Sequence, residues 1–81
     1  MWFVYILLCQ GGSLYTGIST NLQQRFLDHR NGKGGKYTRL HKPIKILHTE
    51  QLPNKPSALK RELQIKGWFR AKKIQILKLE V

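Results

Sequence analysis

The stretch from Trp2 to Ile18, WFVYILLCQGGSLYTGI, decides the fold. Residues 2–9 are apolar on both alternating faces and rich in aromatic and branched side chains, which predicts a strand covered on both sides. Gly11-Gly12 is a hairpin signal, and residues 14–18 resume as a second strand. We therefore expect two neighbouring antiparallel strands at the start of the chain.

A short helix is predicted next, over residues 21–30. Thr20 with Gln23 three positions later forms a capping box, and Asn31-Gly32 supplies a stop. The core contacts of this helix should come from Leu22 and Phe26. We then expect a basic loop over residues 32–36, a turn of helix over 37–41 and a third strand over 44–52. Another loop (53–56) leads into a second helix (56–69). The tail, residues 71–81, could form either a helix or a strand.

This order of elements predicts a single α+β domain over residues 1–81, built on a three-stranded antiparallel sheet. With 81 residues, 41% of them hydrophobic, the chain has room for one core. The single Cys9, in an apolar stretch, is expected to be a reduced core residue.

The charge points to a polyanionic partner. Fifteen Lys and Arg against four Asp and Glu give a formal charge of +11, which favours nucleic acid. A membrane surface is the competing polyanion, but the basic residues from Arg25 to Lys78 do not form a continuous amphipathic helix. No apolar run approaches the ~20 residues of a spanning helix, and no signal-peptide pattern follows Met1. We expect a soluble, cytoplasmic protein, with a monomer as the favoured state.

Several common sites do not fit. Gly35-Lys36 fails as a P-loop, because Arg30 stands where the first Gly belongs and Tyr37 where the hydroxyl belongs. One Cys and three scattered His do not give zinc spacing. The chain has only four carboxylates, too few for a two-metal cluster, so one protein carboxylate would have to hold any metal.

Glu62 is the candidate for that carboxylate. At roughly 100° per residue it falls in the middle of an apolar helix face made by Ala58, Leu59, Ile65 and Phe69. A carboxylate on a core-facing stripe is costly unless it is paired or holds a cation. The structural alternative, favoured when Glu62 is judged by itself, is an i,i+4 ion pair with Lys66.

Arg25 and His29 lie one turn apart on the first helix and should border the sheet. An Arg paired with Asp28 and a His at the edge of the core is the plainer interpretation. The functional one is an Arg fork aimed at a phosphate. Tyr5 and Tyr15, on the two hairpin strands, are weak candidates when taken singly, because strand tyrosines usually serve packing.

Taken together, these residues carry a specific resemblance. Phe3-Val4-Tyr5, Tyr15-Thr16-Gly17, Arg25 and His29 in the next helix, and Glu62 in a later helix resemble the GIY-YIG endonuclease superfamily. The segments LYTGIS, KYTR, KREL, IKGW and RAKK look like its small single-domain bacterial branch, the YhbQ-like proteins. The sequence departs from the name in two places, where Phe3 replaces the first Gly and Thr16 the central Ile of the second motif.

The resemblance implies a GIY-YIG-like sheet flanked by helices and a metal-dependent nuclease, with DNA the favoured substrate. The matching site residues are Tyr5, Tyr15, Arg25, His29 and Glu62. Glu62 would bind one Mg²⁺ or Mn²⁺, and Arg25 and Tyr15 would stabilise charge on the phosphate. Tyr5 and His29 both remain open as the general base, since an unperturbed Tyr has a pKa near 10.

If Tyr5 and Tyr15 share a site, they must lie on one face of the hairpin. A two-residue turn at Gly11-Gly12 would pair Gln10 with Ser13 and place the tyrosines on opposite faces. We therefore predict an odd-length loop or a bulge at residues 10–13. Gly17 is expected to permit a close backbone approach beside Tyr15.

The remaining candidates are contacts to nucleic acid, suited to backbone binding and base stacking, with a solvated loop as the alternative. They are Lys33, Lys36, Tyr37, Arg39 and Lys66. A second function fits the charge equally well, namely a module that binds DNA or RNA without cutting it. A third is a basic protein that binds acidic proteins. The Tyr, Arg and Glu set favours the nuclease, because a binding module has no need of it.

Overall fold

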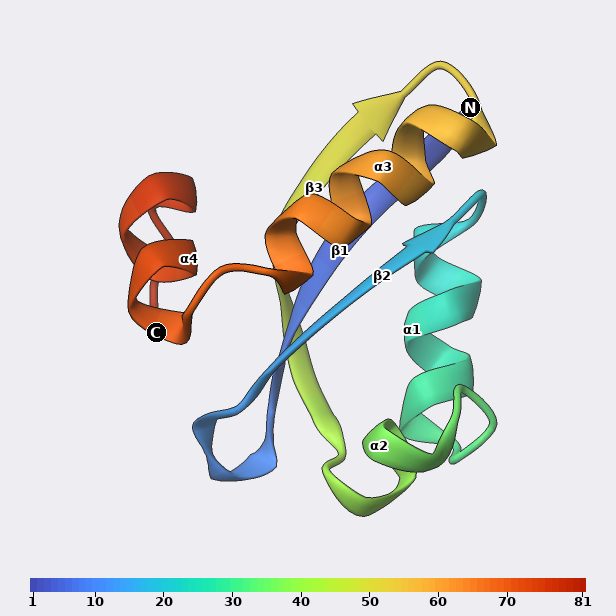
Figure 1. The fold of residues 1–81 in the computed structure, drawn as a ribbon. Helices are drawn as coiled ribbons and strands as arrows, with labels where there is room; N and C mark the ends of the chain where they lie inside the picture. The colour runs from blue at the N-terminus through green and yellow to red at the C-terminus, as the bar shows by residue number, and fades with distance from the viewer.

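A computed structural model describes all 81 residues and shows a three-stranded sheet with helices packed on both faces (Figure 1). The elements follow in the order β1 (Trp2–Cys9), β2 (Leu14–Ser19), α1 (Leu22–Arg30), α2 (Lys36–Leu40), β3 (Pro43–Leu52), α3 (Lys55–Lys66) and α4 (Arg70–Leu77). β1 is the central strand and pairs antiparallel with β2 and β3. The predicted α+β class with a three-stranded antiparallel sheet is confirmed.

The β1–β2 hairpin has the odd-length loop that a shared tyrosine site requires. Cys9 N–H donates to Ser13 C=O at 2.9 Å, and a turn of 3₁₀ helix, Gln10–Gly12, closes the hairpin. Gly11 and Gly12 have φ of 85° and 86°, a conformation that glycine adopts without a steric cost. The register places Tyr5 opposite Gly17 and Leu7 opposite Tyr15, so both tyrosines lie on one face of the sheet.

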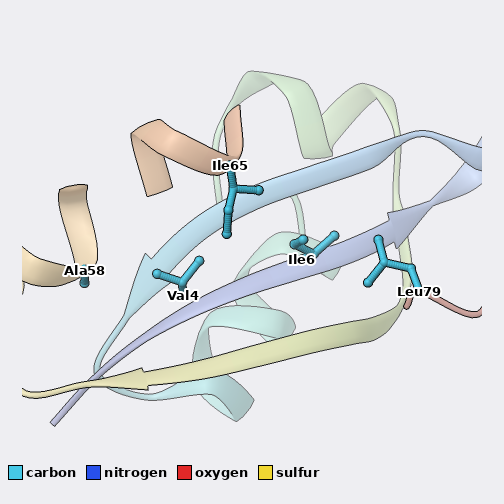
Figure 2. Packing of buried hydrophobic residues seen from close by; sticks show 5 residues of the cluster. All are labelled: Val4, Ile6, Ala58, Ile65 and Leu79. Atoms are coloured by element: carbon cyan, nitrogen blue, oxygen red, sulfur yellow. The ribbon is translucent and has the colours of Figure 1, made fainter. Parts of the chain in front are cut away.

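The two faces of β1 are covered by different helices, which explains why the strand is apolar on both. Figure 2 shows Val4 and Ile6 directed toward Ala58 and Ile65 of α3, with Leu79 joining the same cluster. On the opposite face lie Tyr5, Leu7 and Cys9, packed against Leu22 and Phe26 of α1 as predicted. Cys9 is a buried free thiol.

The helix boundaries differ from the predicted ones, most clearly at the start of the first helix and at the end of the second long helix. The first helix is capped by Asn21, whose Oδ1 accepts from Gln24 N–H at 3.1 Å, so the Thr20–Gln23 capping box is wrong by one position. The second long helix ends at Lys66, because Gly67 caps it. Phe69 therefore lies outside that helix and is 85% exposed, so it is not part of a buried helix face.

The two segments after the first helix and after Gly67 are both helical. The turn of helix predicted over residues 37–41 is present one residue earlier, at Lys36–Leu40. The tail forms α4, followed by Lys78 in the left-handed conformation with φ of 52°. Leu79 then returns to the core. None of the helices combines the length and hydropathy needed to cross a bilayer.

A side-chain clamp joins β3 to α3. Arg61 donates through Nε to Glu50 Oε1 at 2.7 Å and through Nη2 to Oε2 at 3.1 Å. His48 Nε2 lies 2.8 Å from the same Oε2, and the Arg61 guanidinium covers the Trp68 ring at 5.2 Å. The Arg61 hydrogen bonds hold the pKa of Glu50 below its usual value. A bidentate pair of this kind orients α3 on the sheet.

Candidate active site

A hydrogen-bonded chain of three buried side chains forms the centre of the candidate site. The Tyr5 hydroxyl lies 2.9 Å from Nε2 of His29, and Nδ1 of His29 lies 2.7 Å from Oγ1 of Thr38. These residues come from β1, α1 and α2 and are 2%, 0% and 1% exposed. His29 was expected at the border of the sheet, and it is fully buried because α2 closes over it. Thr38 was not predicted.

Burial acts on the two titratable members of this chain in opposite directions. It raises the pKa of Tyr5 to about 12, although a hydrogen bond from Arg25 partly offsets that effect. It lowers the pKa of His29 to about 4, and the positive charge of Arg25 adds to that decrease. A charged group loses hydration on burial, so both side chains are held in their neutral forms near pH 7.

Tyr15 joins the site through the strand register. Its ring centroid lies 6.4 Å from that of Tyr5 and 5.0 Å from that of His29, with an edge-on angle of 63° to the His29 ring. On its other side Tyr15 stacks with Tyr37 of α2, at 5.8 Å and 22°. Tyr15 therefore connects the buried Tyr5 and His29 pair to an aromatic side chain that is 39% exposed.

Two glycines leave the space that the site occupies. A Cβ on Gly17 would overlap the Tyr5 hydroxyl, and one on Gly34 would overlap the His29 ring. Gly17 was expected to permit close approach beside Tyr15, but the tighter neighbour is Tyr5. Gly34 was interpreted only as part of a flexible loop. Both positions require glycine for packing against the site.

Arg25 lies beside the Tyr5 hydroxyl and is anchored to the loop that follows α1. Its Nη2 donates to Gly34 C=O at 3.2 Å. The alternative ion pair with Asp28 is absent, because Asp28 Oδ1 accepts from Gln24 Nε2 at 3.0 Å instead. The guanidinium has five N–H donors, and the contacts to Gly34 C=O and the Tyr5 oxygen leave others available to an anionic ligand.

Glu62 is separated from the other four candidates. It projects from α3, which packs on the Val4 face of the sheet, and its side chain is 14% exposed. Its Oε2 lies 3.3 Å from Nζ of Lys66, so the predicted i,i+4 pair is present. Glu62 makes no hydrogen bond to the Tyr5 group, but its charge contributes to the raised pKa of Tyr5. The structure therefore brings four of the five together and leaves the fifth within electrostatic range.

The side chains of the site could bind one hard cation through a single carboxylate, but they do not form a metal site with several protein ligands. No group of three or more His, Cys, Asp and Glu side chains converges in the structure. One carboxylate, with Oε1 free of hydrogen bonds, matches the way Mg²⁺ binds through one or two carboxylates and substrate phosphate. Glu62 is the residue that could hold such an ion.

The predicted nucleic-acid contacts are all exposed and lie in two places. Four of them occupy the loop after α1 and helix α2, namely Lys33, Lys36, Tyr37 and Arg39. The fifth, Lys66, is at the end of α3 beside Glu62 and is 48% exposed. The first four border the Tyr15 side of the site through Tyr37.

Comparison with known proteins agrees with this arrangement. A family model described as the GIY-YIG catalytic domain matches residues 1–75. A UPF0213 protein of Cupriavidus pinatubonensis is 49% identical over 73 residues, which is 90% of this chain and 81% of that protein. A UPF0213 protein of Staphylococcus saprophyticus is 40% identical over 75 residues, or 93% and 92% of the two chains.

A solved structure supports the same assignment. The solution NMR structure of a UPF0213 protein from Bacillus halodurans is 40% identical to this chain and matches it with a TM-score of 0.61. The match covers 96% of this chain and 84% of that one. With fold and sequence in agreement over nearly the whole length, the chain belongs to the GIY-YIG catalytic domain family, a family of nuclease-type domains.

Proposed function

We propose that this protein hydrolyses phosphodiester bonds in nucleic acid, with DNA as the favoured substrate, one Mg²⁺ or Mn²⁺ ion as cofactor and Tyr5 and His29 as the proton-transfer pair. The observation that carries the proposal is the 2.9 Å contact between the Tyr5 hydroxyl and Nε2 of a fully buried His29. Such a pair can relay a proton, which binding alone does not require.

The proton path follows from the two neutral side chains. If Nδ1–H of His29 donates to Oγ1 of Thr38, Nε2 carries a lone pair directed at the Tyr5 O–H. The attacking water then gives a proton to the Tyr5 oxygen while Tyr5 passes its own proton to Nε2. The resulting hydroxide forms a bond to phosphorus as the P–O bond to the leaving oxygen breaks, and the leaving oxygen takes a proton from solvent. The His29 imidazolium still donates to Thr38. Thr38 acts in this scheme as a positioning residue.

The phosphate would be bound between Arg25 and Tyr15. Arg25 has free N–H donors, and a guanidinium matches the geometry of two phosphate oxygens. The Tyr15 hydroxyl can donate a further hydrogen bond. Both side chains are half-buried, so their interactions with a developing negative charge are less screened than at an open surface.

Glu62 would hold the divalent ion, which supplies charge stabilisation at the leaving oxygen when bound. Oε2 of Glu62 would become available to the ion once Glu62 releases Lys66. That pair is an i,i+4 contact with a lysine that is 48% exposed, so opening it costs roughly 0.5 kcal/mol.

A second candidate function, binding without cleavage, is favoured by two observations. Tyr5 is only 2% exposed, and Glu62 lies in an ion pair on the other face of the sheet.

A cleavage assay separates the two candidate functions. Purified protein should be incubated with labelled DNA and RNA substrates, single-stranded, duplex, nicked and branched, in Mg²⁺, in Mn²⁺ and in EDTA. We expect metal-dependent cleavage that is lost in Tyr5→Phe and His29→Gln and retained in the exposed control Gln51→Ala.

Binding without cleavage of any of these substrates in either metal would contradict the nuclease and support the binding module. Cleavage retained in Tyr5→Phe and His29→Gln at the wild-type rate would show that another group activates the water.

A further inference from the structure

We propose that the rings of Tyr37 and His41 form a stacking platform for an unpaired nucleobase, so that the preferred substrate has a single-stranded or extrahelical nucleotide on the strand that leads to the scissile phosphate. The inference rests on the proposed function for the reaction that follows binding. The platform itself is inferred from a column of aromatic rings that leads out of the candidate site.

The column consists of three nearly parallel rings. Tyr15 and Tyr37 stack at 5.8 Å with an angle of 22°, and Tyr37 and His41 stack at 4.7 Å with an angle of 28°. The inner contacts are different, since Tyr15 meets His29 edge-on at 63°. The geometry thus changes from edge-on packing in the core to parallel stacking toward the surface.

Exposure increases along the column. Tyr15 is half-buried, Tyr37 is 39% exposed, and His41 at the end of α2 is exposed. The solvent-exposed end of the column is therefore the aromatic ring of His41. Offset parallel stacking is the arrangement in which a further planar ring extends such a column.

The positive charge of the segment that carries the column indicates which kind of planar ligand it would bind. A Lys or Arg occupies every third position from Arg30 to Lys45, six in total, and no acidic residue occurs between Asp28 and Glu50. This strip needs a ligand that is both aromatic and polyanionic, and a nucleotide chain is the chemistry that combines the two.

The base on the column must be unpaired. In a continuous duplex both faces of each base are covered by its neighbours, so only a single-stranded, terminal or extrahelical base can stack on a protein ring. The inner end of the column is Tyr15, whose ring lies 5.0 Å from that of His29. A base held at the outer end is separated from Tyr15 by the rings of Tyr37 and His41, so its strand would lead along the column toward the candidate site.

The test is binding of a fluorescent base analogue in EDTA, so that no cleavage occurs. The probes are single strands of about ten nucleotides, a length within the range that one small domain covers. Each carries one central 2-aminopurine, in DNA and in RNA form, and a blunt duplex of the same sequence is the comparison. The variants are Tyr37→Leu, Tyr37→Phe, His41→Leu and, as the matched control on the same helix, Leu40→Ala at a side chain that is 70% exposed.

We expect single strands to bind with quenching of the 2-aminopurine signal. Tyr37→Leu and His41→Leu should raise the Kd for single strands by roughly 5-fold to 150-fold, the range for loss of one base–aromatic stack, and change the Kd for duplex by less than about twofold. Tyr37→Phe keeps the ring and should bind like wild type. The DNA and RNA probes identify which of the two backbones supplies the base.

An equal loss of single-strand and duplex affinity in the two Leu variants, or no quenching in the wild type, would overturn the proposal. Thermal melts of each variant identify a Tyr37→Leu protein that has lost its fold, in which case His41→Leu decides. Quenching without any cleavage in Mg²⁺ or Mn²⁺ would refute the nuclease and leave the platform standing. Cleavage of duplex and single strands at equal rates, without quenching, would refute the platform alone.

Discussion

The Tyr5 hydroxyl and Nε2 of His29 lie 2.9 Å apart, and burial moves their pKa values to about 12 and about 4. Each shift favours a neutral side chain, so the pair shares one hydrogen bond without a net charge. Neither residue alone suits general-base catalysis near pH 7, because the phenol is too weak an acid and the imidazole too weak a base. Together they can relay a proton, because the imidazolium that forms on His29 keeps its hydrogen bonds to Tyr5 and Thr38.

The pH dependence of cleavage distinguishes this pair from a Tyr5 phenolate. A reaction that needs Tyr5 already deprotonated would speed up about tenfold per pH unit between about pH 6 and pH 9. A reaction that needs neutral His29 is limited only below about pH 5, since the pKa of His29 is about 4. We expect single-turnover rates at saturating metal to vary by less than about threefold from pH 6 to pH 9.

A slope of one in the plot of log rate against pH over that range would assign the base to Tyr5 or to a metal-bound water.

Thr38 should affect the rate through its contact with His29. Thr38→Val removes the acceptor for Nδ1–H, and Thr38→Ser restores it. We expect the first to lower the rate roughly tenfold or more and the second to recover most of it.

The stability of the fold should also depend on His29. Its pKa is about 4 in the folded protein and 6.5 in an unfolded chain, so the unfolded state binds more protons between these values. The contribution of the neutral side chain is therefore fully present above pH 6.5 and is lost as the pH falls toward 4. The shift corresponds to roughly 3 kcal/mol.

Thermal or urea unfolding at intervals from pH 7 to pH 4 measures this effect. His29→Gln should be less stable than wild type at pH 7 but should lose less stability on acidification. The control His41→Gln, at an exposed position, should follow the wild-type slope. Equal slopes in all three proteins would contradict the buried neutral state of His29.

The two glycines against the site provide a third test. A methyl group on Gly34 would overlap the His29 ring, and one on Gly17 would overlap the Tyr5 hydroxyl. We expect Gly34→Ala and Gly17→Ala each to lower the free energy of unfolding by about 1 to 3 kcal/mol and to lower cleavage further, because the Tyr5 and His29 contact is displaced.

Gly67→Ala is the matched control. Its φ is −76°, and an added Cβ would meet only backbone oxygens, at 3.4 Å and 3.6 Å. It should therefore change stability by less than about 0.5 kcal/mol. If Gly34→Ala and Gly17→Ala behave like this control, the tight packing around the site is incorrect.

The sheet and the first helix were predictable because local signals agree with the tertiary structure there. The two-sided apolar pattern of residues 2–9 and the glycine pair predicted the hairpin, and the condition that Tyr5 and Tyr15 share a face correctly predicted an odd loop. The predicted end of the second helix at Phe69 was wrong, since Gly67 ends it at Lys66. An apolar residue at the right period does not lie in the helix if a stop precedes it.

The site was predictable only as far as residue type and spacing allow. Four side chains converge because β1, β2 and α1 adjoin, and that arrangement follows from the hairpin and the helix after it. Thr38 and Gly34 were missed as functional neighbours of His29, because their role depends on α2 folding back over α1. No periodicity in the sequence encodes that long-range contact. A Gly in a basic loop and a Thr in a short turn of helix are both typical of solvent-exposed segments.

The sharpest prediction concerns Glu62 as the sole protein ligand of the metal. Glu62→Gln keeps the shape of the side chain and removes its charge, so it should abolish cleavage and weaken Mn²⁺ binding, followed by the EPR signal of the free ion. Loss of the Lys66 pair should matter little to stability, because Lys66 is 48% exposed and water can replace its partner. Lys66→Met should instead leave Mn²⁺ affinity unchanged or higher, since it frees Oε2 of Glu62. A purely structural Glu62 predicts the reverse pattern, in which both variants lose similar small amounts of stability and neither changes Mn²⁺ binding. Cleavage by Glu62→Gln at the wild-type rate would remove Glu62 from the active site, whatever the melting temperatures show.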